Sequence, residues 1–133
     1  MSAADSFFDS NILLYLLSSD TRKADRVEEL LASGGVITVQ VLNEIASVAL
    51  RKLRLDMADI RDLLGVVRGV CDVRPVDLET HERALDLVER YRFSLHDGLI
   101  VAGALLAECT TLHTEDLQDG QRIETLIIAN PFV

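Results

Sequence analysis

Four acidic residues stand near the boundaries of apolar segments. Asp9, Asp97 and Asp116 lie where an apolar element meets a loop, and Glu44 lies near the start of a helix expected to follow a strand. Carboxylates brought together repel one another, which raises their pKa values and costs stability unless a cation joins them. Hard oxygen ligands suit Mg²⁺ or Mn²⁺. If the fold gathers these acids, the chemistry they indicate is metal-assisted hydrolysis of phosphodiester bonds.

Two of these acids also have a purely structural interpretation. Asp97 precedes Gly98–Ala107, ten residues without a polar side chain, and Asp is a common cap at the start of a helix. Glu44 lies at the edge of an amphipathic helix, where a solvated face gives the same pattern. From the sequence alone, both interpretations stay open beside the chemical one.

The fourth acid has to be chosen from the segment Thr114–Gly120, which contains Glu115, Asp116 and Asp119. Side chains alternate along an extended chain, so Asp116 shares a side with Thr114 while Glu115 points the opposite way. Asp119 precedes a glycine and suits a turn. We therefore expect Asp116 to complete the site, with a cap on the following short turn as its structural alternative.

Strand-like and helix-like segments alternate along the chain. Gly98–Ala107 is too apolar for a surface helix and too short to span a bilayer, so a buried helix is expected there. Alternation of this kind favours parallel strand pairing with right-handed crossovers. The expected fold is α/β, a three-layer α/β/α sandwich with a central, mainly parallel sheet, as one domain over residues 1–133. Strands are expected at 6–8, 36–38, within 71–76, at 110–114 and at 125–129, and helices at 11–17, 21–32, 39–53, 57–70, 77–91 and 97–107.

The composition of the chain limits its expected ligands and its expected cell compartment. The 133 residues carry a net charge of −9, and only 5% are aromatic, which argues against broad electrostatic capture of nucleic acid and against stacking platforms for single strands. Cys71 and Cys109 lack metal-binding spacing and are expected to be buried free thiols. Met1–Asp9 has no basic region followed by an apolar stretch, so we expect no signal peptide or membrane anchor and a cytoplasmic protein. The main basic concentration, a possible contact for RNA or a partner although such runs are usually solvated, is Arg51, Lys52 and Arg54.

Other enzyme classes fit the sequence less well. A phosphoacceptor receiver domain needs a lysine late in the chain, and the only lysines are Lys23 and Lys52. A haloacid-dehalogenase-like phosphatase needs D-x-D after its first strand, where Asn11 stands in the third position. No phosphate-binding G-x-x-x-x-G-K or G-x-S-x-G motif occurs. An HD phosphohydrolase needs several histidine ligands, whereas we interpret these histidines as surface or structural residues: His81, His96 and His113.

Four segments, in order and spacing, resemble the acidic motifs of PIN domains and cover essentially the whole chain. They are Phe8–Leu13, Leu42–Ile45, His96–Ala102 and Leu112–Leu117. The compact size and the segment Ile128–Phe132 are most similar to VapC-type toxins of bacterial toxin–antitoxin pairs. The resemblance implies a Mg²⁺-dependent endoribonuclease, with Mn²⁺ as a substitute, that a cognate antitoxin holds inactive.

By the same resemblance, each of the four acids (Asp9, Glu44, Asp97 and Asp116) is metal-binding or catalytic, and Asn11 and Thr114 are supporting polar groups. Many PIN domains carry a further acid shortly before the third one, whereas the sequence here is Ser94–His96, so one versus two metal ions stays open. Self-association, as a homodimer, is also expected. The alternatives are a housekeeping RNA-processing nuclease of the same fold and a non-catalytic binding module for protein or RNA.

Overall fold

Short runs of apolar residues form a six-stranded sheet in the order β3-β2-β1-β4-β6-β5. The computed structural model describes residues 5–133. The prediction that Met1–Asp9 contains no signal peptide rests in part on Met1–Ala4, which lie outside the described residues. β1 occupies the centre of the sheet, pairs in parallel with β2 and β4, and is buried along its whole length. All neighbouring strands are parallel except β5 and β6. The strands are β1 (Ser6–Phe8), β2 (Gly35–Thr38), β3 (Cys71–Arg74), β4 (Thr111–His113), β5 (Arg122–Ile123) and β6 (Leu126–Ala129).

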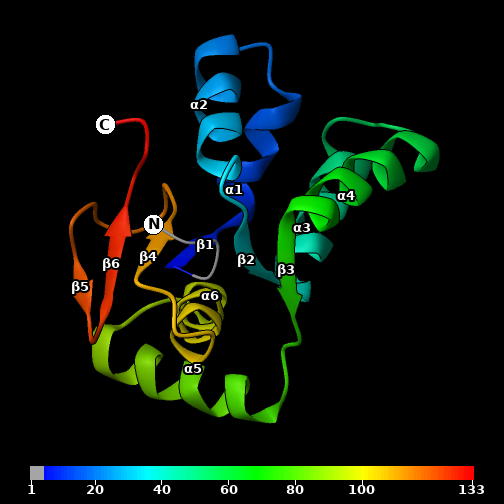
Figure 1. Ribbon diagram of the computed structural model, residues 1–133. Helices are drawn as coiled ribbons and strands as arrows, with labels where there is room; N and C mark the ends of the chain where they lie inside the picture. Colours follow the sequence, from blue (N-terminus) through cyan, green and yellow to red (C-terminus); the bar gives the residue numbers. More distant parts are fainter. Residues whose placement is uncertain (1–4) are drawn as a thin grey trace.

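Helices cover both faces of this sheet. Figure 1 shows α1 and α2 above the row of strands, α3 and α4 at the side of β3, and α5 and α6 below the strands. The predicted α/β architecture with a central, mainly parallel sheet is therefore confirmed. The helical elements are α1 (Ser10–Leu13), the 3₁₀ helix η2 (Leu14–Leu17), α2 (Thr21–Leu31), α3 (Val39–Arg51), α4 (Met57–Val70), α5 (Leu78–Tyr91) and α6 (Leu95–Leu106).

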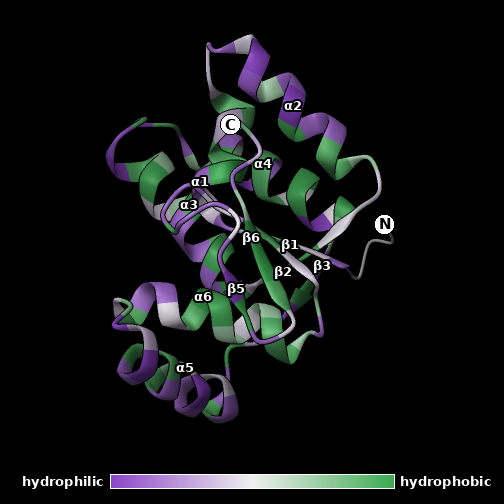
Figure 2. Ribbon diagram, turned by 90° about the vertical axis from the view of Figure 1, so that its left-hand side faces the viewer, coloured by the Kyte–Doolittle hydropathy of each residue, from purple (hydrophilic) through white to green (hydrophobic). Residues whose placement is uncertain are grey.

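Helix α6 is the buried helix expected from the apolar run. Its residues Gly98 and Ile100–Ala104 are buried, and α6 lies between the sheet and α5. A Cβ at Gly103 would lie 2.8 Å from Thr38 Cγ2, and one at Gly98 would lie 2.9 Å from Val88 Cγ2. The two glycines therefore let α6 approach its neighbours on both sides. Figure 2 shows the complementary pattern, with apolar residues on the central strands and hydrophilic residues on the outer surfaces of α2 and α5.

Three local expectations need correction. The helix expected to start at Asp97 begins at Leu95, because the Ser94 hydroxyl accepts a hydrogen bond from the Asp97 backbone N–H at 3.1 Å and so provides the cap. The chain after α1 tightens into a 3₁₀ turn instead of continuing as one α-helix. Strand β5 has two residues, too few to show an alternating pattern in the sequence.

Two further expectations concern the setting of the protein. Cys71 and Cys109 are free and buried, as predicted, and burial raises the pKa of each thiol to about 11. Within residues 5–133, the helices are too short or too polar to cross a bilayer.

Candidate metal centre

The carboxyl ends of β1 and β4 meet at the point where the strand order reverses. β2 and β3 extend the sheet to one side of β1, and β4, β6 and β5 extend it to the other. In open α/β sheets, such a reversal leaves a crevice in which ligands bind. Asp9 directly follows β1 and Thr114 directly follows β4, so their side chains lie at this crevice.

Asp9 is almost fully enclosed, with 1% of its surface exposed. Its Oδ1 accepts a hydrogen bond of 2.7 Å from the Ser10 backbone N–H, and its Oδ2 accepts one of 2.9 Å from the Thr114 hydroxyl. Burial raises the pKa of the Asp9 carboxyl to about 6, although both hydrogen bonds act in the opposite direction. The two hydrogen bonds thus fix the Asp9 side chain in position, but they do not fully offset the cost of burying its negative charge.

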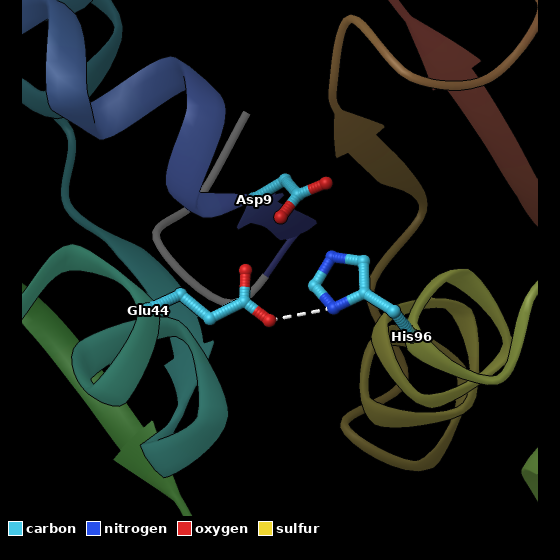
Figure 3. A group of neighbouring side chains, drawn as sticks. All are labelled: Asp9, Glu44 and His96. Atoms are coloured by element: carbon cyan, nitrogen blue, oxygen red, sulfur yellow. Dashed lines mark ion pairs between the residues drawn. The ribbon is translucent and has the colours of Figure 1, made fainter. Parts of the chain in front are cut away.

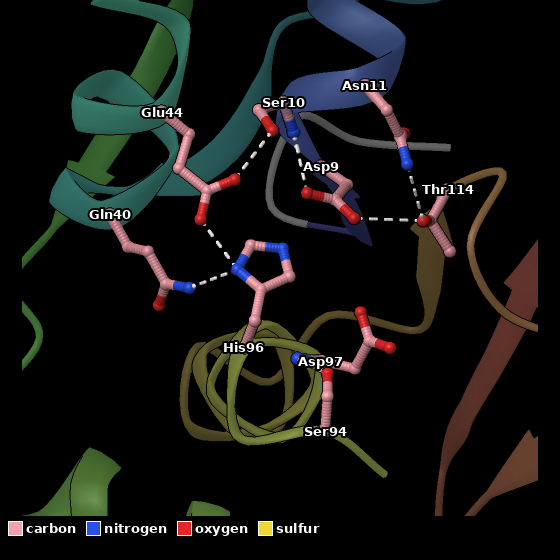
Figure 4. A network of polar contacts seen from close by, with 9 residues as sticks. All are labelled: Asp9, Ser10, Asn11, Gln40, Glu44, Ser94, His96, Asp97 and Thr114. Atoms are coloured by element: carbon pink, nitrogen blue, oxygen red, sulfur yellow. Dashed lines mark hydrogen bonds and ion pairs between the residues drawn. The ribbon is translucent and has the colours of Figure 1, made fainter. Parts of the chain in front are cut away.

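Thr114 connects Asp9 to the loop that carries Asp116. The same hydroxyl that donates to Asp9 accepts hydrogen bonds from Asn11 Nδ2 at 3.3 Å and from the Asp116 backbone N–H at 3.1 Å. Asn11 Oδ1 in turn accepts from the Glu115 backbone N–H at 3.4 Å. Asn11 and Thr114 therefore hold α1 and the loop after β4 in one arrangement (Figure 4).

Glu44 reaches the same crevice from the second turn of α3. Its Oε2 accepts a hydrogen bond of 3.1 Å from the Ser10 hydroxyl, and its Oε1 lies 2.6 Å from His96 Nδ1. Its side chain is 33% exposed. Glu44 thus faces other polar groups of the protein rather than lying on a freely solvated surface.

The centre also contains His96, which the sequence analysis interpreted as a surface or structural residue. Figure 3 shows its imidazole between the carboxyl groups of Asp9 and Glu44, with its base on α6. The Gln40 side-chain amide nitrogen lies 3.0 Å from the same Nδ1. The signal present in the sequence was the position of His96 directly before Asp97, which placed it at the mouth of the buried helix.

Asp97 and Asp116 form a second group of neighbouring ligand atoms with His96. One ligand atom from each of His96, Asp97 and Asp116 falls within 4.8 Å of the others, and the same holds for Asp9, Glu44 and His96. Burial raises the pKa of Asp97, and the nearby Asp116 charge raises it further, against a hydrogen bond with Ser94. The structure therefore brings the four predicted acids together as two groups that share His96.

The other two acids of the loop after β4 have different neighbours. Glu115 accepts a hydrogen bond of 2.8 Å from the Tyr15 hydroxyl, and its carboxylate lies 3.8 Å from Lys23 Nζ. Asp119 accepts a hydrogen bond of 2.7 Å from the Asn130 backbone N–H. Asp116 is thus the acid of this loop that faces His96 and Asp97, and its role as a ligand stays a prediction.

The remaining histidines and the predicted basic contact lie outside this cluster. His113 is buried and stacks on Phe8, with ring centroids 4.9 Å apart, and His81 is exposed on α5. The basic residues are exposed at the end of α3 and in the turn after it: Arg51, Lys52 and Arg54.

The donor set fits a divalent cation. Among residues 5–133, no lysine or arginine forms an ion pair with any of the four acids. Carboxylate oxygens with one imidazole nitrogen form a ligand set that divalent metals accept, and a bound cation would favour the ionised form of the buried Asp9.

Comparisons with known proteins identify the family and the fold of this chain. Residues 6–120 match the family model of the PIN domain. No curated protein sequence matches the chain. Among solved structures, a toxin–antitoxin complex from Klebsiella pneumoniae has a TM-score of 0.70 at 22% identity, over 95% of this chain and 97% of that one.

Two further structures show the same fold. VapC20 of Mycobacterium tuberculosis, described as a toxin that cleaves the sarcin–ricin loop, has a TM-score of 0.66 at 17% identity, covering 84% of this chain and 89% of that one. VapBC2 from Rickettsia felis, bound to a DNA fragment from its promoter, has a TM-score of 0.66 at 20% identity, covering 92% and 96%. The acidic crevice of this chain lies where the strand order reverses, and the family-model match spans most of its sequence. The chain therefore belongs to the PIN domain family.

Proposed function

We propose that this protein is a Mg²⁺-dependent endoribonuclease of the VapC toxin type. Asp9, Glu44, Asp97 and Asp116 would hold the metal and carry out hydrolysis of RNA phosphodiester bonds. The observation that carries the proposal is the convergence of these four acids, from four separate segments, without a lysine or arginine ion pair among the described residues. Such a group of carboxylates costs stability unless a cation offsets their repulsion.

The chain's own residues position this chemistry. When bound, a divalent cation supplies Lewis acidity and positive charge to a phosphodiester. Ser10 and Thr114 hold the buried Asp9 carboxylate in one orientation, and Ser10 also fixes Glu44. Asp116 is exposed, so the centre is open to solvent on the side of this residue.

A hollow of about 570 Å³, lined in part by Glu44, offers room for an unpaired nucleobase. It combines apolar side chains with amide groups, a mixture that suits a base splayed out of a loop. Its lining consists of Val39, Gln40, Asn43, Glu44, Pro75, Val76 and Leu99. In α3, Arg51 follows Glu44 by seven residues, about two turns or ~10 Å, so it lies on a similar side of the helix. RNA extending from the carboxylates along α3 would meet Arg51, then Lys52 and Arg54.

The proposed partner is a cognate antitoxin, because two of the similar structures are toxin–antitoxin assemblies. A basic side chain of such a partner would pair with the carboxylates in place of a metal. A homodimer and a cytoplasmic location are also part of the proposal. Leu78 and Leu85, exposed by 69% and 47% and seven residues apart on α5, give a second copy an apolar surface to cover.

The test combines RNA cleavage with metal-dependent stability. The purified protein should cut a structured RNA with Mg²⁺ or Mn²⁺ but not with EDTA, and Asp97→Asn should lose this cleavage while Asp119→Asn keeps it. Metal at one hundred times its dissociation constant should add about 2.7 kcal/mol to the free energy of unfolding. If the melting temperature stays unchanged across a millimolar titration, the metal centre is wrong.

Partner binding separates the toxin from the two alternatives. Co-expression with the adjacent reading frame should yield one complex with suppressed cleavage. Two independent proteins, with cleavage intact, would favour a housekeeping nuclease. Metal-independent RNA binding without cleavage would favour a non-catalytic module.

A further inference from the structure

We propose that His96 is a ligand of the metal centre through Nε2, held in place by Glu44, and that the site therefore prefers Mn²⁺ over Mg²⁺. The inference rests on the proposed function and changes it at one position: Glu44 supports the metal through His96, and the imidazole nitrogen joins the carboxylates of Asp9, Asp97 and Asp116. The two ring nitrogens of His96 have different contacts.

The first ring nitrogen, Nδ1, serves as a donor. It lies 2.6 Å from Glu44 Oε1, and a contact of this length between an imidazole and a carboxylate requires a proton on the nitrogen. Such a nitrogen has no lone pair with which to accept a hydrogen bond from the Gln40 amide. Yet Gln40 Nε2 lies only 3.0 Å away, and within the described structure Gln40 Oε1 is buried without a partner.

Rotating the Gln40 amide by half a turn removes the clash between two donors at His96 Nδ1. The oxygen and nitrogen of a glutamine amide exchange places by this rotation, and the hydrogen-bond network decides between them. With Oε1 facing the ring, both Gln40 and Glu44 accept from His96 Nδ1–H. The two acceptors then fix the ring's orientation and its tautomer.

Nε2, the second ring nitrogen, keeps its lone pair in this tautomer. Figure 3 shows it on the side of the ring that faces Asp9. A histidine that gives its other N–H to a carboxylate is the usual arrangement of a metal-binding imidazole, because the carboxylate fixes the tautomer and raises the basicity of the ligand nitrogen. Here Glu44 and His96 have this relationship, with the carboxylate of Asp9 beyond them.

His96 lies close to all four acids of the centre. It belongs to both groups of close ligand atoms, the one with Asp9 and Glu44 and the one with Asp97 and Asp116. Mg²⁺ prefers oxygen ligands with near-ideal octahedral geometry, whereas first-row transition ions accept imidazole nitrogen. A nitrogen at this point should therefore favour Mn²⁺ over Mg²⁺.

Pulsed electron paramagnetic resonance of the Mn²⁺-loaded protein tests the ligand directly. We expect modulation from a directly bound ¹⁴N nucleus, and its replacement by the ¹⁵N pattern when the protein is labelled with ¹⁵N-histidine. His96→Asn should abolish the nitrogen signal, and His81→Gln, at an exposed histidine of α5, should leave it unchanged.

Metal titration gives the second readout. His96→Asn should weaken Mn²⁺ binding by at least about tenfold and change Mg²⁺ binding far less, a loss comparable with the effect of removing ligand-supporting groups in other metal sites. Bound Mn²⁺ without nitrogen modulation would overturn the role of His96 and leave the carboxylate centre intact. If the parent protein does not bind Mn²⁺, the metal centre of the proposed function fails as well.

One result would reverse the interpretation. If His96→Asn binds both ions more tightly than the parent, the imidazole competes with the metal as a cation lying between Asp9 and Glu44. That outcome would overturn the proposal.

Discussion

The Thr114 hydroxyl donates a hydrogen bond to Oδ2 of Asp9 across 2.9 Å, joining two residues that lie 105 positions apart in the sequence. Both residues follow strands that pair in parallel, so the backbone register of β1 and β4 sets their separation. The same hydroxyl accepts from Asn11 and from the Asp116 backbone. One buried oxygen atom therefore serves three neighbours that belong to the centre.

Thr114→Val should lower the free energy of unfolding by about 2 kcal/mol, because it leaves buried polar groups unsatisfied. Urea unfolding in EDTA measures this effect, and a Mn²⁺ titration should show weaker binding. Thr114→Ser keeps the hydroxyl and should retain metal binding. Thr125→Val, at an exposed threonine between β5 and β6, should change neither property. Equal metal affinity of the valine variant and the parent at position 114 would contradict this role.

The three acids of the loop after β4 should respond differently when neutralised. Asp116→Asn should lose most RNA cleavage and weaken metal binding, yet keep or slightly raise metal-free stability, because one repelling charge is removed. Glu115→Gln should keep cleavage and lose at most about 1 kcal/mol of stability, since its ion pair with Lys23 is partly exposed. Asp119→Asn should keep cleavage. An inactive Glu115→Gln beside an active Asp116→Asn would show that the fourth carboxylate is wrongly placed.

Packing of α6 on α5 can be tested at a single glycine. A Cβ at Gly98 would lie 3.0 Å from the Ala84 carbonyl oxygen, a backbone atom that cannot rotate away. Gly98→Ala should therefore cost about 1–3 kcal/mol of the free energy of unfolding. Gly65→Ala is the matched control, because a Cβ there meets nothing within 4 Å. This control should stabilise α4 by up to about 1 kcal/mol, and equal effects of the two substitutions would contradict the close packing.

Two buried groups give opposite pH dependences in the metal-free protein. Burial lowers the pKa of His113 to about 4, from 6.5 when unfolded, so the unfolded chain binds more protons between these values and stability falls as the pH drops through them. Burial raises the pKa of Asp9 to about 6, from 3.8, so stability falls as the pH rises through that window. The two effects, each about 3 kcal/mol, should largely offset one another.

His113→Phe keeps a ring against Phe8 and removes one of these two effects. Its stability relative to the parent should be about 3 kcal/mol greater at pH 4 than at pH 7, because the variant has no imidazole to protonate on unfolding. Urea unfolding at both values with EDTA measures the difference. Parallel stability curves for the variant and the parent would contradict the neutral, buried state of His113.

The basic residues after Glu44 in the chain should contribute to RNA binding without touching the metal. Replacing Arg51, Lys52 and Arg54 together by glutamine should weaken RNA binding and reduce its dependence on salt, by a logarithmic slope of about 2 if all three contact phosphates. Mn²⁺ affinity and the melting temperature with metal should match those of the parent.

A second triple variant, in which Arg61, Arg68 and Arg90 are replaced by glutamine, removes the same number of positive charges and so controls for net charge. Arg61 and Arg68 on α4 and Arg90 on α5 are exposed and lie outside the crevice lining. If both triple variants reduce the salt slope equally, the RNA contact is not localised at the end of α3.

The sequence predicts those parts of the fold that repeat a pattern. The ten apolar residues after Asp97 indicate a buried helix, and α6 is one. Met57–Val70, expected to be helical, is α4 with the same limits. The two-residue strand β5 is too short to carry such a pattern, and it forms because the chain folds back antiparallel on β6.

Some residues of the candidate site could likewise be predicted from the sequence, and others could not. Asp9 and Asp116 could be selected because strand ends and side-chain alternation constrain them. The position of His96 before Asp97 places it at the mouth of the buried helix, but its contact with Glu44 depends on the distance between α3 and α6, which only the assembled sheet determines. The partners of Glu44 likewise come from α1 and α6, and nothing in the local sequence of α3 separates this arrangement from a solvated face.

Because β1 pairs with β4, the acidic crevice can form only at a late step of folding. Closing a loop of this length has a large entropic cost, and contacts between distant segments form more slowly than local ones. Helices α1 to α4 and strands β1 to β3 are neighbours in sequence and can meet before β4 joins them. Asp116 and Thr114 reach Asp9 only with that later step, so during synthesis a chain emerging from the ribosome carries its first two acids long before it has a centre. Any activity of this crevice therefore appears abruptly, on completion of the sheet, rather than growing with the length of the chain.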